Sequence, residues 1–333
     1  MKIRIDEIAS AAGVSRSTVS RVLQNHPNVK PQTREKIVEI MEQLGYRPNR
    51  LARGLVTGKL NFVGLIVGDI RNPFYSEIAH VVEDILNERG YMVVLCDSDY
   101  SIAKEKSYLN MIADFGFAGV IMTSATENTE LVEMLKSMDC SVVLINRYLR
   151  NFNCSVVAID NHLGGFLAAE HLIKLGHRNI AMLAGPEDSS SSRERMEGWK
   201  EAFTEYKIPW PGVINSDLRT KFGYDFGISL LKMPKGKRPT AVCAINDAMA
   251  FGVIEAYMEN GYKIPQDLSV IGFDDISTIT YNRIGLTTIR QPQQEMGKAA
   301  ADLLLDRILG VETSAKRVIF EPELIIREST AAI

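Results

Sequence analysis

The first side chains in this sequence that could do chemistry lie near the N-terminus, in a stretch that predicts a short helix. Its outward side would carry two arginines and two serines: Arg16, Ser17, Ser20 and Arg21. In the major groove of DNA, about 12 Å wide, an arginine can hold O6 and N7 of one guanine together, worth about 1–3 kcal/mol per base pair discriminated. Hydroxyls at Ser15, Thr18 and Ser20 are placed for phosphates, which set register but not sequence preference. The pattern indicates a DNA-reading helix.

Three short predicted helices would position these side chains. Apolar residues at i, i+3, i+4 and i+7 mark the first: Ile5, Ile8, Ala9 and Ala12. Gly13 ends it, because glycine readily takes a left-handed turn, and Ser15 caps the second helix. A third helix begins near Pro31 and runs to Leu44. A small residue, a glycine turn and an apolar anchor in this order are typical of a helix-turn-helix.

Charge separates this head from the rest of the chain. Residues 1–59 hold eleven basic and five acidic side chains, a balance of +6, and the whole 333-residue chain carries −3, so the remainder carries −9. A basic head on an acidic body indicates a polyanion-binding module joined to something else. The stretch 47–59 between them is basic, contains one proline and two glycines, and is the predicted linker.

Other features exclude several classes of protein. The early charges at the N-terminus and apolar runs far shorter than about 20 residues exclude a secretory signal and a membrane span, so we expect a cytosolic protein. The four cysteines are scattered in apolar surroundings and are expected to be reduced core residues; neither a metal nor a cofactor is predicted. No HExxH or GxSxG motif occurs, and the glycine-rich stretch 54–59 lacks P-loop spacing. We therefore expect no enzyme.

From Leu60 onward, short apolar runs alternate with helical patterns. The runs are Phe62–Val67, Met92–Cys96, Gly119–Met122, Val142–Ile145, Val156–Ile159, Ile180–Ala184, Ala241–Ile245, Ser269–Phe273 and Ile325–Arg327. Continuous apolar strands separated by helices predict parallel sheets covered on both faces. About 270 residues exceed one typical domain, so two α/β lobes are expected. Such sheets bind ligands beyond the carboxyl ends of their strands, and two lobes add a cleft.

In order and spacing, the motifs of the chain resemble those of the LacI/GalR family of bacterial transcription regulators. The head matches at 14–23, 33–34 and 44–49, and the linker at 51–55. The body matches at Asn72-Pro73-Phe74-Tyr75, Leu175-Gly176-His177, Ser192–Gly198, Asn246-Asp247, Ile271–Asp274 and Thr287–Pro292. The resemblance covers essentially the whole chain. It implies a helix-turn-helix domain (1–46), a hinge (47–60) and a body (61–333) like the periplasmic sugar-binding proteins. Lobe 1 would span about 61–160 plus 292–320, and lobe 2 about 161–291 plus 321–330.

The resemblance also implies how DNA would be read. Two heads of a homodimer would contact the halves of a near-palindromic operator, with Arg16, Ser17 and Arg21 as base readers. Residues 49–55 would form a hinge helix only on DNA, since seven residues are too few for a stable free helix. Leu55 would wedge into the central base step of the minor groove, and Arg50 and Arg53 would hold phosphates. Asn49 begins this hinge.

For the body, the resemblance implies a small-molecule effector between the lobes. Its matching positions are Asn72, Phe74, Tyr75, Asn146, Arg147, Arg195, Asn246, Asp274 and Gln291. The aromatic rings would stack on a sugar ring, and the polar groups would hydrogen-bond neighbouring hydroxyls of a small sugar or sugar phosphate. The run Asp188–Ser192 is predicted to be a loop over the cleft, feeding a helix capped by Ser192. A bound effector would then shift the DNA affinity of a repressor.

Alternatives to a sugar-responsive repressor remain open at this point. A periplasmic binding protein would need a signal peptide where this chain has a helix-turn-helix. A catabolite-control-type regulator would answer to a phosphorylated carrier protein instead of a sugar. A purine-responsive repressor would have an aromatic residue where Leu218 stands, and many relatives have Asp where this chain has Asn146.

Overall fold

The computed structural model describes residues 3–23, 28–46, 60–276 and 285–333. The chain divides into two compact units, Met1–Leu60 and Asn61–Ile333. The predicted linker, residues 47–59, lies outside the described residues. Within the described ranges, no helix has the length and apolar character needed to cross a bilayer.

The head is a bundle of three helices. They are α1 (Ile5–Ala12), α2 (Arg16–Leu23) and α3 (Pro31–Gln43). Their apolar stripes meet in a small core, in which Ile8, Val19 and Ile37 have no exposed surface. Gly13 takes a φ of 68°, which lets α1 end and α2 start within a few residues. The predicted three-helix head is confirmed, with each predicted boundary within about one residue.

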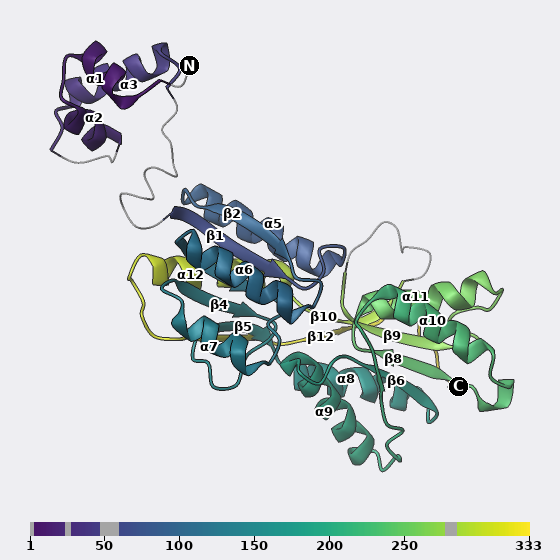
Figure 1. Cartoon of the computed structure of the whole chain (residues 1–333). Coiled ribbons are helices and arrows are strands. Elements are labelled where there is room, and N and C mark those ends of the chain that lie inside the picture. The colour runs from purple at the N-terminus through teal and green to yellow at the C-terminus, as the bar shows by residue number, and fades with distance from the viewer. Residues whose placement is uncertain (1–2, 24–27, 47–59, 277–284) are drawn as a thin grey trace. The chain divides into compact units, whose positions relative to one another are not determined.

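The first lobe of the body is a parallel sheet with the strand order β11-β5-β4-β3-β1-β2. Its strands are β1 (Leu60–Val67), β2 (Met92–Asp97), β3 (Phe117–Met122), β4 (Ser141–Ile145), β5 (Ser155–Ile159) and β11 (Arg317–Phe320). Side chains of β1 enter two different cores: Val63, Leu65 and Val67 join one, and Ile66 joins the other. Helices α5 (Pro73–Glu88) and α12 (Gln293–Ile308) cover one face, and α6 (Ile102–Asp114) and α7 (Thr129–Ser137) cover the other (Figure 1). Apolar side chains on both faces explain why the strands are continuous apolar runs.

The second lobe repeats this design with the order β12-β10-β9-β8-β6-β7. Its strands are β6 (Ile180–Ala184), β7 (Ile214–Asn215), β8 (Ala241–Ala244), β9 (Ser269–Asp274), β10 (Thr287–Arg290) and β12 (Glu323–Ile325). Helices α8 (Asn161–Lys174) and α9 (Ser190–Glu205) pack together on one side, and α10 (Thr220–Leu231) and α11 (Asp247–Glu259) on the other (Figure 1). A 3₁₀ turn, η1 (Lys235–Lys237), precedes β8. The edge strand β12 runs antiparallel to β10, so this sheet is not parallel throughout.

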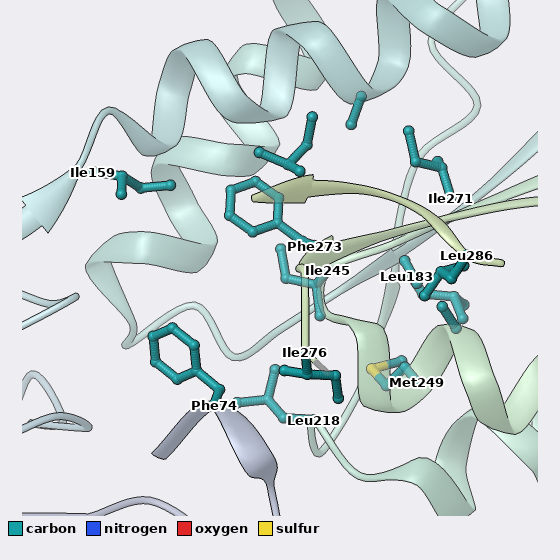
Figure 2. Packing of buried hydrophobic residues seen from close by; sticks show 14 of the residues in the cluster. Phe74, Ile159, Leu183, Leu218, Ile245, Met249, Ile271, Phe273, Ile276 and Leu286 are labelled. Atoms are coloured by element: carbon teal, nitrogen blue, oxygen red, sulfur yellow. The ribbon is translucent and has the colours of Figure 1, made fainter. Parts of the chain in front are cut away.

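The chain passes between the two sheets after β5, after β10 and between β11 and β12. Each sheet therefore contains segments that are distant in sequence. The two lobes share one large hydrophobic cluster, in which Phe74 of α5 lies beside Leu218 of the other lobe (Figure 2). The predicted fold class, a helical head on a two-lobed α/β body, is confirmed.

Candidate functional site

The polar face of α2 is open to solvent. Arg16, Ser17 and Arg21 are exposed, and Ser20 and Thr18 are half-buried, while Val19 and Val22 point into the core. Arg16 lies 3.7 Å from the carboxylate of Asp6 on α1, with both side chains largely exposed. Such an exposed pair is weak, so it leaves Arg16 free to exchange its partner for a base or a phosphate.

Ser15 has a structural role at the start of this helix. Its Oγ accepts a hydrogen bond from the Thr18 N–H at 3.2 Å, which caps α2 as expected. The same Oγ lies 2.7 Å from Oγ of Ser17 and 2.9 Å from Oγ1 of Thr18. These hydroxyls therefore form one cluster at the positive end of a helix, where anions are favoured. The other predicted DNA contacts, Asn49, Arg50, Arg53 and Leu55, lie outside the described residues.

In the body, two neighbouring cavities lie at the ends of the strands. The inner cavity, about 30 Å³, is lined by eight of the nine predicted effector residues: Asn72, Phe74, Tyr75, Asn146, Arg147, Arg195, Asn246 and Asp274. The outer cavity, about 250 Å³, is lined by Arg71, Arg219, Lys221 and Ala248, among others. Asn72, Tyr100 and Leu218 line both cavities and mark the boundary between them.

Arg195 is one of two cations that line the inner cavity. It is 4% exposed, and its Nε donates to Oδ1 of Asn161 at 2.8 Å and its Nη1 to the carbonyl of Ile245 at 2.7 Å. Its guanidinium stacks 3.5 Å from the ring centroid of Phe273. Burial lowers the pKa of Arg195 to about 10, and nearby Asp274 opposes that change. Arg195 therefore stays cationic at neutral pH and is held rigidly.

The backbone of α8 places Arg195. A Cβ on Gly165 of α8 would collide with the carbonyl oxygen of Arg195, so the two helices pack backbone against backbone. Glycine provides this close approach because it has no side chain. The position of Arg195 thus depends on a residue that never contacts a ligand.

Asp274 lines the inner cavity close to Arg195, and Gln291 holds it in place. Oδ1 of Asp274 lies 3.8 Å from Nη1 of Arg195 and accepts a hydrogen bond from Nε2 of Gln291 at 2.6 Å. Gln291 does not line the inner cavity and instead supports Asp274 from behind, while its Oε1 is buried without a partner among the described residues. Burial raises the pKa of Asp274, and the charge of Arg195 counteracts this. A ligand that hydrogen-bonds Asp274 would favour its ionised form.

Two of the predicted asparagines also serve as helix caps. Asn72 accepts from the N–H of Phe74 at 3.0 Å at the start of α5. Asn246 accepts from the N–H of Met249 at 2.9 Å at the start of α11, and donates to the carbonyl of Leu218 at 3.0 Å. Each amide keeps an unused donor or acceptor site for a ligand. Capping and lining the cavity are compatible here.

Arg147 joins the inner cavity to a buried carboxylate. Its Nη1 donates to the carbonyl of Ser124 at 3.1 Å, and its Nε is buried without a partner among the described residues. Glu105 of α6 has no exposed surface and accepts from the N–H and the hydroxyl of Thr126, each at 3.4 Å. Burial raises the pKa of Glu105 to about 7, and Arg147 is the strongest influence that lowers it. No local sequence pattern predicts that Glu105 is buried.

Backbone strain gathers at the same site. Tyr100, Asn146, Leu218 and Asp274 all have positive φ values although none is glycine, at 56°, 65°, 68° and 122°. Each of these residues lines the inner cavity. Such conformations cost about 1–3 kcal/mol each and are found most often at binding and catalytic sites.

Sequence reasoning missed part of the lining. Tyr100, which was not predicted, lines both cavities, whereas Ser191 and Ser192, from the run predicted to lie over the cleft, line the inner one. The expectation that Ser192 caps a helix is wrong: α9 begins at Ser190, and Ser189 is the cap, accepting from the N–H of Ser192 at 3.3 Å. Tyr100 follows a strand end, which is the signal that could have found it. Among the described residues, no cluster of three or more His, Cys, Asp or Glu side chains could hold a metal ion.

Comparison with known proteins supplies the family. Residues 4–49 match the family described as "Bacterial regulatory proteins, lacI family", and residues 169–330 match a periplasmic binding protein-like domain. Catabolite control protein A of Priestia megaterium is 37% identical over 99% of this chain and 100% of that protein. The chain belongs to the lacI family. It is therefore a DNA-binding transcriptional regulator, the class to which its relatives belong.

Other similar proteins differ in what their names say they bind. The transcriptional repressor PurR of Vibrio parahaemolyticus is 33% identical, over 98% of each chain. A lac repressor dimer bound to operator and an anti-inducer is 26% identical over 100% of both chains, with a TM-score of 0.84. A LacI-family regulator from Enterococcus faecium with bound ribose is 35% identical over 82% of this chain and 99% of that one, with a TM-score of 0.72.

Proposed function

We propose that this chain is a homodimeric repressor whose affinity for a near-palindromic operator is set by a small sugar bound between its lobes. The assignment of domains belongs to the proposal: residues 1–46 bind DNA, 47–60 act as the hinge, and 61–333 bind the effector and dimerise. Lobe 1 takes about 61–160 plus 292–320, and lobe 2 takes about 161–291 plus 321–330. In this proposal the protein has no catalytic role, needs no cofactor and acts in the cytoplasm, where the operator is.

The polar lining of the inner cavity carries the effector assignment. Two cations, a carboxylate and three amides converge there on a space bounded by the rings of Phe74, Tyr75 and Tyr100. Rings contact the C–H face of a sugar, and paired polar groups match neighbouring hydroxyls. Buried polar groups also penalise ligands that leave them unpaired, which gives selectivity. The ribose complex of the Enterococcus faecium regulator supports a sugar of this kind.

The exposed face of α2 carries the DNA assignment. Arg16, Ser17 and Arg21 would contact bases, and the hydroxyls of Ser15, Thr18 and Ser20 would contact phosphates. The hinge residues Asn49, Arg50, Arg53 and Leu55 keep their predicted roles as a proposal. A sugar that binds one arrangement of the lobes more tightly would shift the population of DNA-binding dimers.

The test combines effector binding with operator binding. The purified chain is heated with pentoses, hexoses, disaccharides, sugar phosphates and purine bases; a ligand at about 100 times its dissociation constant adds about 2.7 kcal/mol of stability. We expect a sugar to raise the melting temperature and to change operator affinity in a fluorescence-anisotropy titration. A ligand that stabilises the chain without changing operator affinity would contradict the coupling.

Arg195→Ala tests the centre of the site. We expect it to lose sugar binding while operator binding is retained, with circular dichroism to check folding. Lys200→Ala, an exposed cation on the same helix, is the matched control and should bind sugar normally. Sugar affinity of Arg195→Ala equal to that of the unaltered chain, measured by calorimetry, would refute the role of Arg195.

Two other effectors have a specific observation in their favour. The 37% identity with catabolite control protein A favours a phosphorylated carrier protein as the partner. The 33% identity with PurR favours a purine. Binding of a phosphocarrier with no response to sugar would establish the first, and a purine as the only stabilising compound would establish the second.

A further inference from the structure

The cleft holds more space than its predicted effector residues enclose. The inner cavity of about 30 Å³ has room for about two water molecules, whereas the outer cavity is about 250 Å³. Two polar groups of the inner cavity already have partners behind the lining, Asp274 in Gln291 and Arg195 in Asn161. A sugar unit therefore enters the inner cavity only when the lobes move, but the outer cavity is already formed. Because Asn72, Tyr100 and Leu218 line both, the two cavities are adjacent.

The outer cavity has the mixed lining that a sugar ring needs. Pro73, Tyr100 and Ile276 give it an apolar wall, from both lobes. Asp69, Arg71 and Arg219 add hydrogen-bonding groups to the same lining. The C–H face of a ring would contact the apolar wall while its hydroxyls reach the charged groups.

The charges of this lining balance one another. Arg71 donates to both carboxylate oxygens of Asp69, from Nε at 2.7 Å and from Nη2 at 2.9 Å. Arg219 of the second lobe donates to Oδ1 of Asp99 at 2.6 Å, and Asp99 also accepts from Nη2 of Arg71 at 3.3 Å. Two guanidinium groups thus face two carboxylates, and the third cation of the lining, Lys221, pairs with Asp225 at 2.9 Å. An anion would therefore have to displace a carboxylate from its partner. Hydroxyl groups can instead add to such pairs as donors and acceptors without separating them.

We propose that the outer cavity is a second subsite, which takes a neutral sugar unit joined to the unit bound at Arg195. The effector is then a neutral disaccharide or glycoside in preference to a monosaccharide or a sugar phosphate. This inference rests on the proposed function, because it assumes a sugar at the inner cavity. Leu218 and Tyr100, at the boundary of the two cavities, would flank the linkage between the units.

The test measures affinity by calorimetry on the full chain. The probes are cellobiose, maltose, lactose and sucrose, their component monosaccharides, and glucose 6-phosphate. We expect one disaccharide to bind at least about tenfold more tightly than either of its monosaccharides, since its second ring adds contacts in a formed cavity. Ala248→Leu, which fills the outer cavity from α11, should remove that advantage and leave monosaccharide affinity unchanged. Glu255→Leu, exposed on the same helix, is the control and should change neither.

The outcomes separate this proposal from the proposed function. Equal affinity for a disaccharide and its monosaccharides, or an equal loss of both in Ala248→Leu, overturns the second subsite and leaves the sugar repressor intact. Tighter binding of glucose 6-phosphate than of every neutral sugar overturns the argument from balanced charges, again without touching the proposed function. If none of the probes binds, the second subsite fails; if the pentoses and other sugars of the thermal screen also leave the melting temperature unchanged, the sugar repressor fails with it.

Discussion

Glu105→Gln tests how burial beside the effector site changes the stability of the body. Glu105 has no exposed surface, and its burial raises its pKa from 4.5 to about 7. Each pKa unit corresponds to about 1.4 kcal/mol, so ionising Glu105 costs the folded state about 3 kcal/mol relative to the unfolded chain. Glutamine removes the ionisation but keeps an oxygen that accepts from Thr126.

The sign follows from which state binds the proton more tightly. The folded state holds the proton of Glu105 up to a higher pH than the unfolded state does. The free energy of unfolding should therefore fall as pH rises from about 4.5 to about 7, and this contribution stays level above that range. The free energy of unfolding of Glu105→Gln, relative to that of the unaltered chain, should therefore rise by about 3 kcal/mol between pH 4.5 and pH 8.

Urea unfolding at a series of pH values measures this difference directly. Comparing the variant with the unaltered chain at each pH cancels the titration of other groups, such as His171 and His177. Glu133→Gln, an exposed residue on α7, controls for the loss of one carboxylate. A stability difference that is the same at pH 4.5 and pH 8, or that shifts against the variant as pH rises, would refute the reasoning.

Three further predictions concern the head and the helix pair that holds the effector site. Arg21→Ala should weaken specific operator binding by about 1–3 kcal/mol per half-site while sugar binding stays intact; unchanged operator affinity in a gel-shift titration would count against a base-reading role. Gly165→Ala should push α9 away from α8 and cost about 1–3 kcal/mol of stability. Because Arg195 moves with α9, sugar binding should also weaken. A melting temperature and a sugar affinity both equal to those of the unaltered chain would show that the helices adjust freely. Ile37→Ala should lower the free energy of unfolding of the head by about 2–5 kcal/mol and abolish operator binding. The sugar-dependent melting of the body should stay unchanged, which differential scanning calorimetry with and without sugar would show.

Local sequence determined the elements. The apolar periodicity of each helix, which brings Ile8, Val19 and Ile37 into one core, and the turn at Gly13 are enough to define the head. Both depend only on residues that are neighbours in the sequence. The apolar strand runs from Phe62 onward likewise lie within two residues of the observed strand ends, but β7, β10 and β11 were not among the predicted runs. The last run, Ile325–Arg327, overlaps β12 (Glu323–Ile325) only at its first residue, and β12 is an antiparallel edge strand.

The effector residues were found in a different way. Resemblance to a family, not local pattern, nominated positions from Asn72 to Gln291, and eight of those nine line one cavity. Nothing in the spacing of these residues along the chain places them together. The structure also assigned different tasks within the set: Asn72 and Asn246 cap helices, and Gln291 supports Asp274 instead of lining the cavity.

Only the tertiary structure decided the burial of Glu105, the strained backbone of Tyr100 and Leu218, and the pairing of Asp99 with Arg219. Asp99 and Arg219 come from different lobes, and Glu105 meets Thr126 from another segment of its own lobe. Hydrophobic periodicity is set by residues a few positions apart, so it specifies helices and strands. Charge balance, cavity volume and pKa depend on which distant segments meet, and that is fixed only when the two sheets pack against their helices and face each other.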